Sequence, residues 1–441
     1  MESIDSRESM TSSHALLGFL MLLNILNMVD RNLLSSFGPQ VVEDLSLTDS
    51  QFGLLTGTIF VFFYSIVALF MGALADRYNR PRLIAAGLML WSLLTAYSGL
   101  AKTFLQIGVA RLFIGVGEST LTPASISLLS DKYPQNRRGM AAGIYYLGVP
   151  LGAGGSFLVA GLLGPTLGWR NCFLLLGGLG IVLTIPLIFI KDPRGKADTT
   201  SQRAEADDSA GIKEVVACLR ARPALALTML GAVFLHIPIG AGQFAQLWLV
   251  RERGFDPAEI ATLYGALFII FGVFGSLLGG IASDWYQSRY AGGRVRFLAL
   301  LMLGMSPLLL GYRWVAPDSP LFIIGMSTGF ILMSAFYGPA FSSVGDLSPV
   351  HMRARMIAVL LLACNLVGLG FGAVLTGLVS DVLKASAVHN PLTWALIASD
   401  LMSLLTVPCF IWASLHIARS KESIASRVKD TGDSNVTAGT G

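Results

Sequence analysis

The sequence is poor in charge. Asp, Glu, Lys and Arg make up only 13% of the 441 residues, whereas 54% of the residues are hydrophobic. Soluble globular domains usually carry about 25% charged residues. This composition therefore excludes a soluble protein of ordinary type and indicates an integral membrane protein.

Cysteine and histidine are scarce as well, which excludes several kinds of chemistry. The four cysteines form no C-x-x-C pair, so neither disulfides nor a zinc site is indicated. The five histidines form no H-E-x-x-H motif, G-x-S-x-G is absent, and the glycine clusters GVGEST and GLGFGA fall within helical runs. We therefore expect that the protein is not an enzyme and binds no cofactor. A membrane-embedded enzyme is the least favoured alternative.

Long apolar runs dominate what is present. A helix needs about 20 apolar residues to cross a hydrocarbon core about 30 Å thick, and such windows recur along the chain. We predict twelve membrane-spanning helices, at residues 14–37, 50–75, 83–101, 104–129, 139–163, 171–191, 224–249, 258–283, 296–315, 320–345, 355–383 and 392–417. The polar residues 1–13 contain no cleavage site, so the first span should be retained as the targeting signal.

The distribution of basic residues predicts the orientation in the membrane. Segments after even-numbered spans, together with both termini, hold 23 of the 31 Lys and Arg residues, and segments after odd-numbered spans hold six. By the positive-inside rule both termini are cytoplasmic. The net charge of +4 then reflects topology, so no nucleic-acid partner is expected. Short loops favour a bacterial inner (plasma) membrane.

Two loop sequences recur in the second half of the chain. GALADRYNRPR from Gly72 resembles GIASDWYQSR from Gly280, and SDKYPQNRRGMAAG resembles GDLSPVHMRARMIAV with Asp131 matching Asp346. The offsets, 208 and 215 residues, are similar and indicate a six-span unit used twice. We expect an N-terminal six-helix bundle at residues 1–192 and a C-terminal six-helix bundle at 223–418. Residues 193–222 would form a cytoplasmic linker that either contains a short surface helix or is a mere tether, and residues 419–441 would form a cytoplasmic tail.

Four charged residues fall inside the first and fourth predicted spans. Asp30 and Arg31 are in the first span, and Arg111 and Glu118 are in the fourth. A charge at a helix centre in lipid costs about 2.5–3.5 kcal/mol, so such residues usually face a protein interior or a water-filled cavity. Arg111 and Glu118, about 10 Å apart along the axis, share one helix face. Asp30 and Arg31 point in different directions, so each needs a partner elsewhere.

The motifs resemble one family of transporters. The pattern G-x-x-x-D-R-x-x-R from Gly72 to Arg80, its weaker copy at Gly280–Asp284 and GWRNCF before the sixth span resemble the major facilitator superfamily. Asn79 stands where many members have glycine, and Trp285 replaces a basic residue. VDRNLLSSFGPQ, RLFIGVGEST and IYYLGVPLGAGG are most similar to the spinster family, which is associated with proton-linked movement of lysolipids and sphingoid phosphates. Anion:cation symporters for organic acids share the Asp-Arg pair and remain the alternative.

The resemblance implies an all-α fold of two six-helix bundles around a central cavity. It places the first and fourth spans beside that cavity, so we predict Asp30 near Arg111 and Arg31 within reach of Glu118, in one aqueous chamber. Asp30 and Glu118 would couple transport to protons, and Arg31 and Arg111 would be their charge partners or bind an anionic headgroup. The alternative is a set of static ion pairs that fix helix packing.

The second half has no charges at the corresponding positions. Adding 215 to Arg111 and Glu118 gives Met326 and Met333, which indicates an apolar wall suited to an amphipathic substrate. Ordinary bundle packing is the alternative for each of these residues. We predict that the substrate cavity contains Asn27, His236, Gln243, Met326, Phe330, Met333 and Tyr337. Asp400, an intramembrane acid without a visible partner, is expected to be structural.

The loop signature predicts a cytoplasmic gate. Asp76 would cap a helix N-terminus, and Arg77 and Arg80 would pair with acids such as Asp131. The gate would comprise Gly72, Asp76, Arg77, Arg80, Asp131 and Asp284. The sequence thus predicts a monomeric, proton-coupled secondary transporter that moves an amphipathic, anionic, lipid-like substrate by alternating access, with an organic-anion/proton symporter as the alternative.

Overall fold

The computed structural model describes residues 2–193 and 212–419, apart from the side chains at positions 2–12, 69, 72, 73, 76 and 212. The described residues form helices and connecting turns. Twelve helical segments are long and apolar enough to cross a membrane, which confirms the predicted number. These segments are Ser13–Ser36, Asp49–Ala68, Arg80–Leu100, Phe104–Lys132, Arg138–Leu162, Gly164–Phe189, Pro223–Arg251, Pro257–Arg289, Gly293–Gly311, Pro320–Leu347, Val350–Ala385 and Pro391–Arg419.

Several spans consist of two or more shorter helices. In the first half the helices are α1 (Glu2–Ser36), α2 (Gly38–Asp44), α3 (Asp49–Thr56), α4 (Thr58–Arg77), α5 (Arg80–Leu100), α6 (Phe104–Glu118), α7 (Leu121–Lys132), α8 (Arg138–Tyr146), α9 (Gly148–Leu162) and α10 (Gly164–Phe189). After α11 (Ile212–Ala221) come α12 (Pro223–Ala241), η2 (Gly242–Phe244), α13 (Ala245–Arg251), α14 (Pro257–Arg289), α15 (Gly293–Gly311), α16 (Pro320–Ala335), α17 (Tyr337–Leu347), η3 (Val350–Met352), α18 (Arg353–Ala363), the π-helical η4 (Cys364–Gly370), α19 (Phe371–Ala385), α20 (Pro391–Ser403) and a last helical segment at 406–419.

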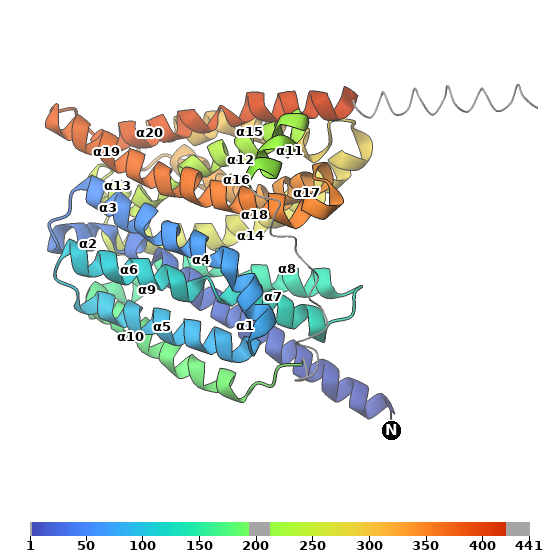
Figure 1. The fold of residues 1–441 in the computed structure, drawn as a ribbon. Coiled ribbons are helices and arrows are strands. Elements are labelled where there is room, and N and C mark those ends of the chain that lie inside the picture. The colour runs from blue at the N-terminus through green and yellow to red at the C-terminus, as the bar shows by residue number, and fades with distance from the viewer. Residues whose placement is uncertain (1, 194–211, 420–441) are drawn as a thin grey trace, which may run out of the picture.

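The helices form two bundles that lie side by side (Figure 1). The first half of the chain, blue to green, fills the lower part of the view, and most of the second half, yellow to red, fills the upper part. We call the end at which α1 begins the proximal end and the opposite end, where α1 gives way to α2, the distal end. The predicted domain boundaries stay a prediction, and residues 194–211 of the linker and 420–441 of the tail lie outside the described residues.

Close helix contacts join the bundles. Helix α9 of the first half packs against α14 of the second, and α3 packs against α19. A Cβ atom added at Gly154 or at Gly265 would lie 2.6 Å from the main-chain oxygen of the other glycine. Small residues allow this backbone approach, as in many membrane helix pairs. The glycine-rich VPLGAGG segment therefore serves helix packing between the two halves.

The outer surfaces of the bundles suit lipid. Large apolar side chains that are 64–77% exposed in the isolated chain include Phe70, Leu105, Phe189 and Ile281. A soluble monomer rarely exposes extensive apolar patches. These side chains therefore form the surface that the hydrocarbon core of a bilayer would cover.

Several predicted helix ends differ from the structure. The sixth span begins at Gly164 rather than 171, because a helical turn precedes Gly168, which breaks the helix with a φ of 73°. The eighth span continues to Arg289, so the whole GIASDWYQSR motif is helical rather than partly a loop. The ninth ends at Gly311 rather than 315, and the turn that follows carries Arg313.

Candidate functional site

Arg31 and Glu118 form an ion pair between α1 and α6. Nε and Nη2 of Arg31 each donate to Oε2 of Glu118 at 3.2 Å. The guanidinium carbon also lies 4.3 Å from the ring centroid of Tyr64 and 5.0 Å from that of Phe60, both in α4. The Glu118 side chain is fully buried, whereas 22% of the Arg31 side chain is exposed. Arg31 is therefore the member of the pair that water or a ligand can reach.

Arg111 lies near Asp30, as predicted, but binds main-chain oxygens rather than the Asp30 carboxyl group. Its guanidinium donates to the main-chain oxygens of Leu55, Asp30 and Arg31, at 3.4, 3.5 and 3.1 Å. Among the described residues it forms no ion pair within 4 Å with the Asp30 carboxyl group. The Leu55 carbonyl lies in the last turn of α3, where carbonyls lack helical partners. Arg111 thus satisfies main-chain groups near the break between α3 and α4.

Asp30 is buried close to these arginines, and the Trp91 indole lies near its carboxyl group. By distance and angle, neither carboxyl oxygen accepts a hydrogen bond from a described residue. Asp30, Arg111 and Glu118 are each at most 3% exposed. The prediction that all four charged side chains share one aqueous chamber is therefore wrong for this conformation, because only Arg31 is open. The reason is that Arg111 turns toward main-chain carbonyls and seals its part of the site.

A cavity of about 120 Å³ lies between α1 and the second half. Four of the seven predicted cavity residues line it, namely Gln243, Met326, Phe330 and Met333. Ser35 of α1, also in the lining, donates a hydrogen bond to Gln243 and so links the two halves. Further lining residues that the sequence analysis missed include Asn32, Phe157, Tyr264, Phe268, Arg313 and Asp400.

The other three predicted cavity residues lie outside this lining. His236 is buried, its Nδ1 is 3.0 Å from the Ala232 oxygen, and its ring packs edge-on against Phe336 and Tyr337. Asn27 is buried in α1. In this conformation His236 is a packing residue, whereas the Tyr337 side chain contacts the His236 ring but is 36% exposed, so its place in the cavity stays a prediction.

Asp400 has a partner, contrary to expectation. Nε of Arg313 donates to its Oδ2 at 3.0 Å, and both side chains are buried. This pairing was not predicted from the sequence. The turn after α15 places the Arg313 side chain inside the bundle.

The predicted gate residues form two clusters at the proximal end. Arg80, fully buried at the start of α5, pairs with Asp131 at 2.6 Å and with Asp192 at 2.5 Å. In the second half Arg294 pairs with Asp284 and with Asp346, both at 2.8 Å. Each cluster stays within one half of the chain in this conformation. The matched acids Asp131 and Asp346 thus each bind an arginine near the start of a helix.

The remaining gate predictions concern Arg77, Asp76 and Gly72. Arg77 is exposed at the end of α4. The predicted capping role of Asp76, and the Gly72 position of the motif, fall on residues whose side chains lie outside the described part of the chain. The gate stays a prediction, because no described contact of Arg80, Asp131 or Asp284 joins the two halves.

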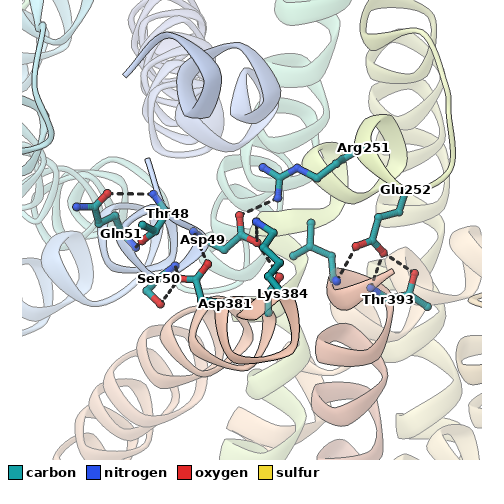
Figure 2. Close-up of polar contacts among 11 residues, drawn as sticks. Thr48, Asp49, Ser50, Gln51, Arg251, Glu252, Asp381, Lys384 and Thr393 are labelled. Atoms are coloured by element: carbon teal, nitrogen blue, oxygen red, sulfur yellow. Dashed lines mark hydrogen bonds and ion pairs between the residues drawn. The ribbon is translucent and has the colours of Figure 1, made fainter. Parts of the chain in front are cut away.

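At the distal end, by contrast, charged residues join the two halves directly (Figure 2). Asp49, the first residue of α3, accepts from Arg251 at 2.8 Å, from Lys384 at 2.7 Å and from Ser380 at 2.6 Å. All three donors belong to the second half. Figure 2 shows Arg251 and Lys384 converging on the same carboxylate. We call Asp49, Arg251, Lys384, Ser380 and Asp381 the distal network.

Asp381 completes this network from α19. Its carboxylate accepts from the main-chain N–H groups of Asp49 and Ser50, at 3.1 and 2.8 Å, and so caps the N-terminus of α3 across the interface. The distal network was not predicted from the sequence, because charged residues near the ends of membrane spans are common at the boundary between membrane and water. The sequence did contain one signal for the start of α3, because Thr48 and Gln51 form a capping box there.

Comparisons with known proteins identify the family. The model of the Major Facilitator Superfamily matches residues 20–372. An MFS-type efflux pump of Mycolicibacterium smegmatis is 26% identical over 410 residues, which cover 92% of this chain and 93% of that protein. The sphingosine-1-phosphate transporter SPNS2 of Xenopus tropicalis is 24% identical over 403 residues, covering 86% of this chain and 76% of that protein.

A solved structure has the same fold. The crystal structure of a bacterial homologue of the human lysosomal transporter spinster, in an inward-facing and unoccupied conformation, superposes with a TM-score of 0.80 at 24% identity. The match covers 92% of this chain and 98% of that chain. The chain therefore belongs to the Major Facilitator Superfamily of membrane transporters, and within this superfamily it is similar to the spinster proteins.

Proposed function

We propose that this transporter moves an amphipathic, anionic, lipid-like substrate by alternating access and couples that movement to protons. It acts as a monomer in the inner membrane of a bacterium, with both termini in the cytoplasm, so the distal end faces outward. The observation that carries the proposal is the partly exposed Arg31–Glu118 pair beside the buried Asp30. Ionisable groups inside a membrane bundle commonly mark ion and substrate pathways.

The Arg31–Glu118 pair supplies the coupling step. A proton that binds to Glu118 neutralises its carboxylate and weakens the hold on Arg31, whose guanidinium then binds an anionic headgroup. Release of the proton restores the pair and expels the headgroup. Asp30 is the second proton carrier, since its buried oxygens accept no hydrogen bond from a described residue that would satisfy a negative charge. Arg111 holds α1, α3 and α6 in place around this step.

The lining of the cavity supports a substrate with an apolar chain, which enters when the cavity widens from about 120 Å³ during the transport cycle. Its walls contain Phe157, Phe268, Phe330 and the methionines Met326 and Met333, while Asn32, Ser35 and Gln243 supply hydrogen-bonding groups. Small-molecule sites commonly combine apolar walls with a few polar groups. The name of the relative SPNS2 indicates a substrate of this kind, a long-chain base with a phosphate group.

Uptake into liposomes tests the proposal. Purified protein is reconstituted, and the flux of a radiolabelled single-chain lysophospholipid is measured with and without a pH gradient. We expect a flux that the gradient increases and that an excess of small organic acids leaves unchanged. The exposed acid Asp318 offers a matched control as Asp318→Asn, which should behave as the parent. Competition by small organic acids, or no flux of the lipid, would overturn the lipid assignment in favour of an organic-anion symporter.

A further inference from the structure

The second half holds a buried ion pair that the coupling step does not use. Arg313, in the turn after α15, binds Asp400 of α20 at 3.0 Å, and their side chains are 7% and 2% exposed. Removing two charges from water is costly, and apolar residues of similar size often stabilise a core at least as well. Packing alone is therefore a poor explanation for this pair.

The pair lies in the wall of the cavity between the two halves. The charged residues of the cavity lining are Arg313 and Asp400, and most of the remaining lining is apolar or aromatic. Phe268, Phe330 and Met333 are among these apolar side chains. A ligand with an apolar chain in this cavity would therefore meet a charged group that belongs to the second half.

The guanidinium group of Arg313 is held in place by aromatic rings. Its central carbon lies 4.7 Å from the ring centroids of both Trp248 and Tyr312. A tyrosine phenol is uncharged near neutral pH, so Asp400, rather than Tyr312, is the counterion of Arg313. Arg253, whose central carbon lies 5.6 Å from the Trp248 centroid, adds positive charge nearby.

The contact between Arg313 and Asp400 leaves room for a further acceptor. The hydrogen bond described between them uses Nε alone, whereas a guanidinium group can bind a phosphate or carboxylate with two parallel N–H donors. An oxyanion that enters the cavity can therefore replace Asp400 as the main acceptor. No comparable exchange is available to Arg111, whose donors bind main-chain oxygens.

We propose that Arg313 binds the anionic group of an amphiphile in this cavity and that Asp400 is the resident counterion which this group displaces. The assignment rests on the proposed function, since it names a second anion-binding residue, in the second half, for the same class of substrate. Arg31 and Arg313 then offer one anion-binding guanidinium in each half of the transporter.

Equilibrium binding to the purified full-length protein tests this assignment without a membrane gradient. The probes are octyl phosphate, octyltrimethylammonium and inorganic phosphate, and tryptophan fluorescence reports binding because Trp248 contacts Arg313. We expect octyl phosphate to bind more tightly than either other probe. Inorganic phosphate binding as tightly as octyl phosphate would overturn the assignment to an amphiphile.

Two variants separate a binding role from a structural one. Arg313→Gln combined with Asp400→Asn leaves no buried charge unpaired, and should weaken octyl phosphate binding roughly 10- to 100-fold while octyltrimethylammonium binding stays unchanged. Asp400→Asn alone removes the competing acceptor and should tighten octyl phosphate binding. Arg289→Gln is the matched control, since Arg289 stacks on Trp285 at an exposed site and should leave all affinities unchanged.

The results distinguish this inference from the proposed function. Unchanged octyl phosphate affinity in the double variant, or weaker affinity in Asp400→Asn, would overturn the role of Arg313. The binding pattern could instead be as expected while liposomes show no proton-driven flux. That result would reject the coupling mechanism but would still support Arg313 as an anion-binding residue.

Discussion

At the scale of single residues, three arginines inside the bundles differ in what they bind. Arg31 binds a carboxylate and remains partly exposed, Arg313 binds a carboxylate beside the cavity, and Arg111 binds main-chain oxygens. One of these oxygens belongs to Leu55, beside the break between α3 and α4, where lipid alone would leave the carbonyl without a donor. Arg111 is therefore a positioning residue, whereas Arg31 and Arg313 are available to ligands.

Replacing Arg111 should destabilise the fold rather than change selectivity. Arg111→Gln leaves the Leu55 carbonyl short of a donor, at a cost of about 1–3 kcal/mol, and should lower the thermal unfolding midpoint in detergent by roughly 5 °C. Arg170→Gln is the matched control, because Arg170 also donates to a main-chain carbonyl, that of Ala101, but from a partly exposed position. A midpoint equal to that of the parent in Arg111→Gln would contradict this role.

Some of these charged residues were predicted from the sequence and others were not. Asp30, Arg31, Arg111 and Glu118 stood out because charge is rare within apolar runs, and the structure brings Arg31 and Glu118 together. The carbonyl partners of Arg111 could not be predicted, because the order of apolar and polar residues does not show which main-chain oxygens a side chain will meet. The partner of Asp400 was missed for a related reason, since Arg313 belongs to a turn that folds inward.

At the scale of helices, the two ends of the molecule are held differently. At the proximal end the arginine clusters tie helices together within each half, while at the distal end Asp49 of α3 is bound by residues of α13 and α19. The α3–α19 contact therefore has to break before the distal end can open. We infer that the distal network helps to hold this closed state.

Removing the charge of Asp49 should shift the protein toward the distal-open state. Asp49→Asn cannot form ion pairs with both Arg251 and Lys384, and the loss of two partly exposed pairs should increase the open population by about tenfold. The measurement is the rate at which a water-soluble maleimide added from the distal side labels Asn32→Cys, a position in the cavity lining. The four native cysteines are buried and give little background.

Glu252→Gln is the control for this experiment. Glu252 lies beside the distal network (Figure 2), but its carboxylate accepts from main-chain N–H groups of Leu392 and Thr393, all within the second half. It should therefore leave the labelling rate close to that of the parent. Equal rates in Asp49→Asn and the parent would mean that the network does not hold the distal end closed.

At the scale of the whole molecule, the two halves share a plan but differ in their charged sites. The repeat was visible in the sequence, and the Arg80–Asp131 and Arg294–Asp346 pairs occupy matching places in it. Met326 and Met333 line the cavity, as the apolar-wall prediction required. The second half does carry a buried ion pair, Arg313–Asp400, at positions of the repeat other than those of Arg111 and Glu118.

The fold was more predictable than the site for a physical reason. Each membrane span needs about 20 apolar residues, so twelve spans leave a strong periodic signal in the sequence. Cavity walls depend on which faces of several helices meet, and the helix breaks near Phe37, Gly57 and Phe336 alter those faces. His236 was therefore assigned to the cavity although it is buried against Phe336 and Tyr337.

The central claim is that proton binding at Asp30 and Glu118 drives the transport cycle. The most direct test is the pH dependence of substrate flux in liposomes, compared between the parent, Asp30→Asn and Glu118→Gln. We predict that the flux of the parent rises with a proton gradient, and that each variant loses this dependence while still binding substrate. A pH dependence equal to that of the parent in both variants would contradict the claim.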